Sequence, residues 1–71
     1  MNNQIWFYEK GSYKAYTEDR RLINKLTFWK NCKLSCQYRF PGGSGVDFII
    51  PSKLYHRVSK LLRLSAEKSL S

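Results

Sequence analysis

The chain has 71 residues, and its 13 Lys and Arg against 5 Asp and Glu give a formal net charge of +8. Hydrophobic residues make up 42% of it, which is enough for one small core and excludes a chain that is disordered along its whole length. A small domain with this much unbalanced charge repels itself. The imbalance therefore favours a polyanionic partner, with nucleic acid as the leading candidate.

The sequence lacks the segments that are typical of export or membrane insertion. Its first residues have neither the basic start nor the apolar stretch of a signal peptide. The longest apolar run, 46–50, is interrupted by Asp47 and is much shorter than the ~20 residues that cross a bilayer. We therefore expect a cytoplasmic protein with no membrane partner.

The first 16 residues predict a β-hairpin. A strand is expected over 4–9, which is rich in Ile and aromatic residues. Its alternation places Ile5 and Phe7 on one face and Trp6 and Tyr8 on the other. Gly11 can adopt a positive φ and so predicts a turn at 10–12, before a second strand over 13–16.

A helix is predicted over 18–30, with Thr17 as its N-cap and Asn31 at its end. The acids that follow the cap suit the positive end of the helix dipole. Phe28 falls among the polar residues rather than on the apolar stripe. The apolar stripe consists of Leu22, Ile23, Leu26 and Trp29. The basic side consists of Arg20, Arg21, Asn24 and Lys25.

The stretch 33–40 alternates strictly and predicts a strand with one buried and one wet face. We expect the buried face to carry Leu34, Cys36, Tyr38 and Phe40, and the wet face Lys33, Ser35, Gln37 and Arg39.

A flexible loop is expected at 41–45, followed by a strand over 46–50. Val46, Phe48 and Ile50 would enter the core. Asp47 would then lie on the opposite face of the sheet, where a charge needs a partner. An ion pair with Arg39 or Lys33 is the simplest solution, and a binding role for Asp47 is the alternative.

The last predicted element is a helix that Ser52 caps after Pro51 has ended the strand. Its apolar stripe consists of Leu54, Val58, Leu61 and Leu62. Its basic side consists of Lys53, His56, Arg57, Lys60 and Arg63.

The element order is therefore ββαββα, which predicts an α+β fold. We expect a four-stranded, mainly antiparallel sheet with both helices packed on one face. Residues 1–66 would form a single small basic domain, and 67–71 a frayed polar C-terminal tail.

Cys32 and Cys36 are predicted to be reduced thiols, with at least Cys36 buried. Four residues of a straight strand span ~13 Å, whereas a disulfide requires Cα atoms within roughly 7 Å of each other. One histidine and a Cys-x3-Cys spacing do not match the usual zinc sites. We therefore expect neither a disulfide nor a metal site.

Catalysis is not expected either. Acid–base and nucleophilic mechanisms need paired groups within hydrogen-bond reach, and the five acids are scattered along the chain. His56 falls on the basic side of the last helix. The glycine-rich stretch 42–45 lacks the Lys-Ser/Thr end of a phosphate-binding P-loop. The sequence thus predicts no catalytic residue, no cofactor and no small-molecule substrate.

Two surfaces are candidates for binding, and the first is the sheet face away from the helices. Aromatic rings interleaved with cations are typical of sheets that hold single-stranded nucleic acid. The alternative is that a second copy of the chain covers this face in a homodimer. The residues expected there are Trp6, Tyr8, Lys14, Tyr16, Lys33, Ser35, Gln37, Arg39 and Ile49.

The second surface belongs to the helices. Neither of their basic sides contains an acid beyond the first turn, whereas a solvated face normally mixes charges. If both helices lie on one side of the sheet, their cations merge into one patch. Its members would be Arg20, Arg21, Lys25, Lys53, Arg57, Lys60 and Arg63.

We therefore expect a non-catalytic protein that binds DNA or RNA through phosphate contacts. Lys33 and Arg39 on the sheet would add to the helical cations, and aromatic contacts would come from Trp6, Tyr8, Tyr16 and Phe28. The alternative is a protein-interaction module or small inhibitor that docks on an acidic protein, with Phe28 or Trp6 as the anchor.

Overall fold

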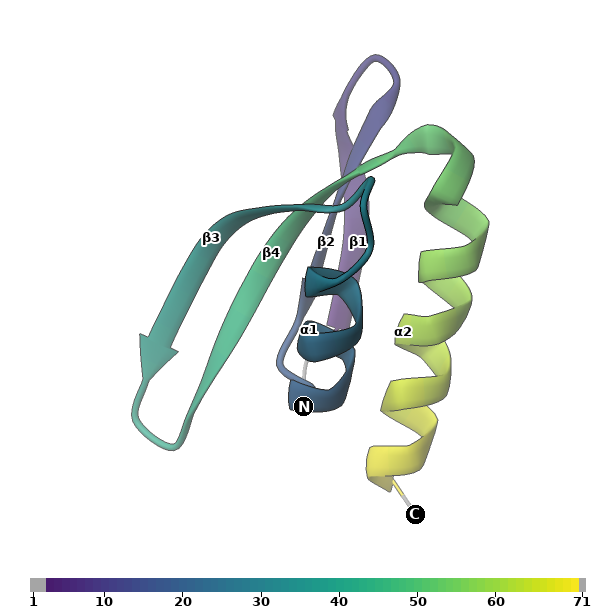
Figure 1. Ribbon diagram of the computed structural model, residues 1–71. Coiled ribbons are helices and arrows are strands. Elements are labelled where there is room, and N and C mark those ends of the chain that lie inside the picture. Colours follow the sequence, from purple (N-terminus) through teal and green to yellow (C-terminus); the bar gives the residue numbers. More distant parts are fainter. Residues whose placement is uncertain (1–2, 71) are drawn as a thin grey trace.

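The computed structural model describes the backbone of residues 3–70 and the side chains of residues 3–67. Its element order confirms the predicted α+β fold (Figure 1). Met1 and Asn2 of the predicted domain, and Ser71 of the predicted tail, lie outside the described residues. The elements are β1 (Asn3–Glu9), β2 (Ser12–Thr17), α1 (Arg20–Thr27), β3 (Lys33–Phe40), β4 (Gly43–Pro51), the 3-10 helix η1 (Ser52–Leu54) and α2 (Tyr55–Leu70).

The four strands form one antiparallel sheet in the order β1-β2-β4-β3. The two hairpins therefore meet through their second strands, and their first strands lie at the two edges. Ala15 of β2 is opposite Phe48 of β4 at the middle of this junction, and both are fully buried. Because Ala15 is small and Phe48 is large, both side chains fit side by side into the same layer of the core.

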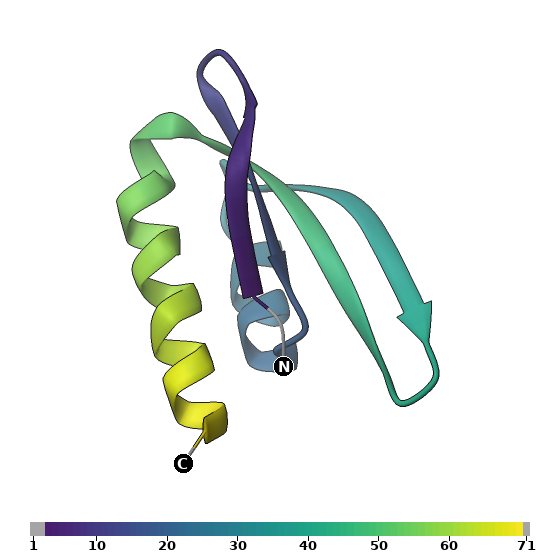
Figure 2. The ribbon, with the colours of Figure 1, turned by 180° about the vertical axis from the view of Figure 1, so that it is seen from behind.

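Both helices cover one face of the sheet, and we call the uncovered face the open face (Figures 1 and 2). α2 packs on β1 and β2, and α1 packs beside α2. The far end of the β3–β4 hairpin extends beyond both helices in Figures 1 and 2. As a result, all eight residues of β3 are exposed.

The core lies between the sheet and the helices. Phe48 and Ile50 of β4 belong to one cluster with Leu26 of α1 and Val58 of α2, and all four side chains are fully buried. Full burial of a side chain of this size contributes about 1.5–3 kcal/mol to stability. This cluster confirms the inward face predicted for 46–50. The other buried apolar residues are Ala15, Leu22, Cys32, Val46 and Leu62.

α1 begins later than predicted, because Asp19 and not Thr17 is its N-cap. The Arg21 backbone N–H donates to Asp19 Oδ1 at 2.9 Å, as an N-cap requires. Thr17 is fully buried at the end of β2, where its hydroxyl donates to Asn3 Oδ1 at 2.7 Å and accepts from the Asp19 N–H at 3.1 Å. Because its hydroxyl bonds to Asn3 of β1, Thr17 belongs to the sheet and does not cap α1.

α1 also ends earlier than predicted, at Thr27, with Phe28 as its C-cap in place of Asn31. The Thr27 hydroxyl donates to the Ile23 carbonyl at 2.7 Å, a local bond that competes with the helical pattern. Trp29 therefore follows the helix and still packs against the core.

The predicted cap of the last helix, Ser52, opens the short helix η1 instead, and no side chain caps the N-terminus of η1. α2 then continues through Leu70, so it includes residues that we assigned to the tail.

A β-bulge in β3 overturns the faces predicted for that strand. Leu34 is opposite Phe48, but the next paired residue, Cys36, is opposite Asp47, so Ser35 is the extra residue. Each side chain after the bulge is shifted to the other face. Tyr38 and the residues that alternate with it therefore lie on the open face, and Gln37 and Arg39 on the helix side.

The predicted loop 41–45 is also shorter than expected. Only Pro41 and Gly42 form the turn, and the φ of +90° at Gly42 requires glycine there. Gly43, Ser44 and Gly45 belong to β4. Gly43 is opposite Phe40 and makes room for its ring, whereas Gly45 is opposite Tyr38 and makes room for the ring of Tyr16 on the neighbouring strand β2.

Candidate nucleic-acid interface

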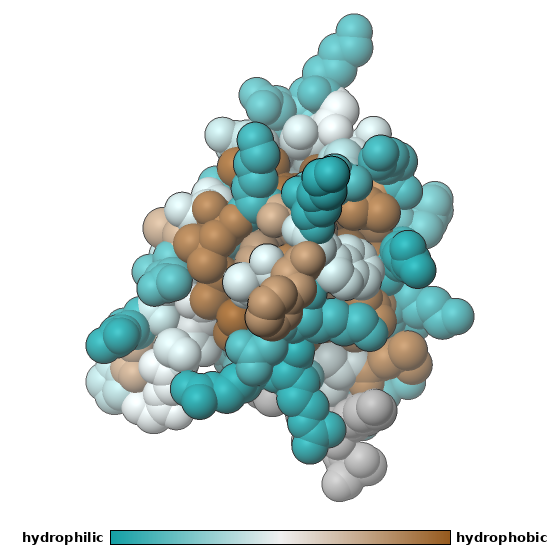
Figure 3. Space-filling view, viewed as in Figure 1, coloured by the Kyte–Doolittle hydropathy of each residue, from teal (hydrophilic) through white to brown (hydrophobic). Residues whose placement is uncertain are grey.

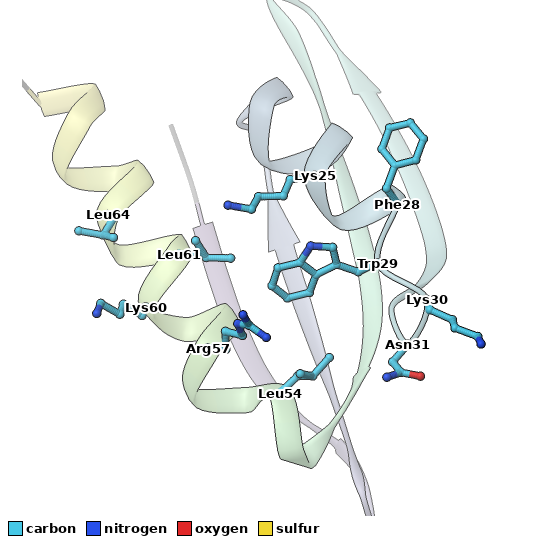
Figure 4. A pocket seen from close by; sticks show the side chains of 10 residues that line it. All are labelled: Lys25, Phe28, Trp29, Lys30, Asn31, Leu54, Arg57, Lys60, Leu61 and Leu64. Carbon is cyan, nitrogen blue, oxygen red and sulfur yellow. The ribbon is translucent and has the colours of Figure 1, made fainter.

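A groove of about 790 Å³ lies between α1 and α2 on the helix-bearing side of the molecule. The sequence places Lys25 in the last turn of α1 and Arg57 and Lys60 on successive turns of α2. We call it the helix groove (Figure 4), and its lining residues are Lys25, Phe28, Trp29, Lys30, Asn31, Leu54, Arg57, Lys60, Leu61 and Leu64.

Four of these residues are cationic and none is acidic. Figure 4 shows Lys25 reaching from α1 toward α2 and Arg57 lying close to Trp29, whereas Lys30 points away from α2 and Lys60 points away from α1. Lys25 and Arg57 therefore face the opening, and Lys30 and Lys60 lie at its outer edges. Figure 3 shows that hydrophilic side chains project over this face of the molecule, with hydrophobic residues exposed between them.

The Trp29 ring forms the aromatic wall of the helix groove. It projects into the space between the two helices, and the Arg57 guanidinium lies over it at 5.4 Å from the ring centroid (Figure 4). Such a cation–π contact holds Arg57 in place. The contact therefore favours a position of the guanidinium group at the groove.

Phe28 is the most exposed large hydrophobic residue described, with 87% of its side chain accessible. It follows α1 directly and lines the rim of the helix groove, where its ring points away from α2 (Figure 4). The sequence placed Phe28 outside the apolar stripe of the helix, and its exposure agrees with this placement.

The other predicted cations lie elsewhere. Arg20 and Arg39 line a separate hollow of about 260 Å³ between α1 and the β3–β4 hairpin. Lys33, opposite Ile49, lies on the open face at the sheet edge. The last three, Arg21, Lys53 and Arg63, are exposed and lie outside the helix groove. Lys30 was not among the predicted cations, because it lies at the end of the predicted helix 18–30 and was assigned to neither of its sides.

The open face carries the aromatic residues of β1 and β2 as predicted. Trp6 and Tyr8 are partly exposed, and Lys14 Nζ lies 4.7 Å from the centroid of the Tyr8 ring. Tyr16 also lies on this face, in register with Asp47. The prediction was wrong for β3, because Gln37 and Arg39 lie on the helix side.

A shallow hollow of about 380 Å³ lies on the open face. The bulge brings Tyr38 and Phe40 into it, and sequence reasoning missed both because it placed them in the core. We call it the sheet hollow, and its lining residues are Gln4, Trp6, Tyr16, Tyr38, Phe40 and Asp47.

Asp47 is 97% buried, with an exposed fraction of 3%. The Tyr38 hydroxyl donates to its Oδ2 at 2.7 Å, so its partner is Tyr38 rather than the expected Arg39 or Lys33. This bond to Asp47 raises the pKa of Tyr38, with smaller contributions from a hydrogen bond with Cys36 and from burial.

Tyr16 completes this network. Its hydroxyl donates to Glu18 Oε2 at 2.8 Å, and its ring meets the Tyr38 ring edge to face with 5.8 Å between the centroids. Burial first, and then the Glu18 carboxylate, raise the pKa of Tyr16. Both tyrosines therefore remain neutral hydrogen-bond donors at physiological pH.

The two cysteines are free thiols. Cys32 is buried, and burial raises the pKa of its thiol. Cys36 is exposed, against the prediction, because the bulge turns it out of the helix side. Within the described residues no cluster of three or more potential metal ligands occurs, and none of the described helices is long and apolar enough to cross a membrane.

Comparison of the chain with protein-family models, curated proteins and solved structures finds no match. The functional argument therefore rests on the geometry and charge of the chain itself.

Proposed function

We propose that this protein is a small, non-catalytic nucleic-acid-binding protein, and that its helix groove holds the phosphate backbone. The observation that supports this most is the gathering of Lys25, Lys30, Arg57 and Lys60 around one groove that no acid lines. Cations with no nearby carboxylate remain available to phosphates, and each neutralised phosphate releases counterions. The same proposal places the activity in the cytoplasm.

Aromatic side chains at the helix groove suit the bases of the same strand. Phe28 exposes 87% of its side chain beside the cations, and stacking of one base on such a ring is worth about 1–3 kcal/mol. An unpaired base can reach this ring more easily than a paired one. Single strands are therefore expected to bind more tightly than duplexes.

The test is fluorescence anisotropy with labelled single-stranded and duplex DNA and RNA across a salt series. Four phosphate contacts predict that log K falls with log salt with a slope of about −3 for single strands. In the Lys25→Gln/Lys60→Gln variant, the slope is expected to become shallower by about 1.4, which corresponds to two lost contacts.

A control variant is Lys10→Gln, which removes one positive charge outside the helix groove. It is compared with Lys25→Gln alone, whose slope should become shallower by about 0.7, whereas the slope of Lys10→Gln should stay within about 0.3 of that of the unaltered protein. Equal effects of the two single variants, or binding that does not respond to salt, would overturn the proposal.

The rival function is docking on an acidic protein, and the exposure of Phe28 favours it as well, since aromatic anchors carry much of the energy of protein interfaces. Affinity purification with and without nuclease separates the two functions. Partners that disappear after nuclease treatment support the nucleic-acid proposal, and partners that survive it and need Phe28 contradict it.

A further inference from the structure

The sheet hollow lies on the open face and shares no lining residue with the helix groove. Four of its six lining residues are aromatic, and its one charged residue is Asp47. No Lys or Arg among the described side chains lines it. In a protein with a net charge of +8, this is a local reversal of charge that the helix groove does not use.

The Asp47 carboxylate has one oxygen left to bind a ligand. The Tyr38 hydroxyl bonds to Oδ2, and the described residues supply no hydrogen bond to Oδ1. In the described residues, no fully buried side-chain oxygen or nitrogen lacks a partner. Oδ1 must therefore reach the surface of the hollow, where it can accept a hydrogen bond from outside the chain.

The rings around Asp47 form walls rather than a flat platform. Tyr16 and Tyr38 meet at an interplanar angle of 67°, and Trp6 and Phe40 complete the lining. A nucleobase stacks best on one flat surface, whereas a cation is attracted to the face of every ring around it. The chain shows this chemistry nearby, where Lys14 lies over Tyr8 at 4.7 Å.

From these observations we propose that the sheet hollow binds an arginine side chain presented by a partner protein. The planar guanidinium can stack on an aromatic ring and donate to a carboxylate at the same time, which an ammonium group cannot do equally well. Charge complementarity with Asp47 supplies the attraction, and the rings exclude water from the pair. The proposal goes beyond nucleic-acid binding and does not depend on it.

The two tryptophans let one experiment report on both sites, because Trp6 lines the sheet hollow and Trp29 the helix groove. We would titrate the ¹⁵N-labelled protein with Nα-acetyl-arginine amide and follow the two indole N–H signals. The neutral citrulline analogue, which has nearly the same shape, is the control ligand. The expected result is a shift at Trp6 and not at Trp29, with the citrulline analogue binding at least tenfold more weakly.

The Asp47→Asn variant should lose at least tenfold in affinity for the arginine probe. Glu9→Gln, which removes an exposed acid outside the hollow, should change it less than twofold. If Asp47→Asn fails to fold, Trp6→Leu replaces it, because Trp6 is partly exposed, and a severalfold loss is expected.

Several results would overturn the proposal. They are equal binding of the arginine and citrulline probes, a preference of the hollow for guanosine, and dimerisation of the free protein that Asp47→Asn abolishes, since a second copy would then be the occupant. An oligonucleotide that shifts Trp29 while arginine amide shifts nothing would remove this proposal and leave the nucleic-acid proposal intact.

Discussion

The Tyr38 hydroxyl donates to Asp47 Oδ2 across the boundary between the edge strand β3 and the central strand β4. The bond exists because the bulge at Ser35 turns Tyr38 onto the same face as Asp47. It partners a carboxylate that the sheet would otherwise bury alone, which is costly. The bulge is therefore what allows an acid to lie in the middle of this sheet.

Tyr38→Phe is expected to lower the free energy of unfolding near pH 7, because it removes one hydrogen bond to a charged group. The raised pKa of Tyr38 fixes the pH window. The stabilisation is complete below the ordinary tyrosine pKa near 10 and disappears as pH rises through the higher pKa of the folded state.

Urea unfolding from pH 7 to 12 measures this difference. Tyr8→Phe is the control, since Tyr8 is a partly exposed tyrosine on the same face. A Tyr38→Phe protein that is as stable as the Tyr8→Phe protein at pH 7 would show that the bond contributes nothing.

Gly45→Ala should destabilise the protein by about 1–3 kcal/mol through overpacking. A Cβ atom at Gly45 would lie 2.6 Å from ring carbons of Tyr16, so the ring would have to move and lose its hydrogen bond to Glu18. Thermal unfolding checks this, with Gly43→Ala as the milder control because its Cβ would lie 3.2 Å from the Phe40 ring.

A double variant identifies the cause. If the clash is responsible, the two sites are coupled, and the cost of Gly45→Ala should fall by at least about 0.5 kcal/mol when Tyr16 is already alanine. An unchanged cost in that background would attribute the effect to the backbone instead.

The sequence was sufficient for the element order and for the inward residues of β4, because Val46, Phe48 and Ile50 alternate without interruption and are all buried. It failed for β3, where the alternation is equally regular. An extra residue leaves the pattern of the strand itself unchanged while it reverses the faces beyond it. The only signal lay in the partner strand, where Gly43 and Gly45 are opposite Phe40 and Tyr38.

Helix periodicity predicted those residues of the candidate site that lie on the helices. Lys25, Arg57 and Lys60 were expected on the helices, and they line one groove. Lys30 could not be found in this way, because α1 ends at Thr27 and helical spacing no longer applies to the residues that follow it. The sheet hollow was hidden for the same reason as the faces of β3.

Ser65→Ala should weaken the link between the two helices by about 1 kcal/mol, the usual worth of a hydrogen bond. The Ser65 hydroxyl of α2 donates to Asp19 Oδ2 at the N-cap of α1. This bond, first among several causes, holds the pKa of Asp19 below its usual value. The stabilisation is therefore complete above the unfolded pKa near 3.9 and disappears as pH falls through the lower folded pKa.

Unfolding measured between pH 2 and 7 tests this dependence. The gap between the unaltered protein and Ser65→Ala should stay constant above about pH 5 and close in acid. Ser59→Ala, also in α2, is the control, and a gap that persists undiminished at pH 2 would contradict the role of the Asp19 carboxylate.

The cations of the helix groove should destabilise the free protein, because like charges held around one opening repel one another. Lys60→Gln is therefore expected to raise the free energy of unfolding by up to about 0.5 kcal/mol at low salt, the usual limit for a surface substitution. The gain should vanish near 1 M salt, where the Debye length is about 3 Å. Thermal unfolding at the two ionic strengths measures it, and Lys10→Gln is the control because Lys10 lies outside the groove. A variant that is less stable than the unaltered protein at low salt would mean that Lys60 is engaged within the fold and is not available to a phosphate.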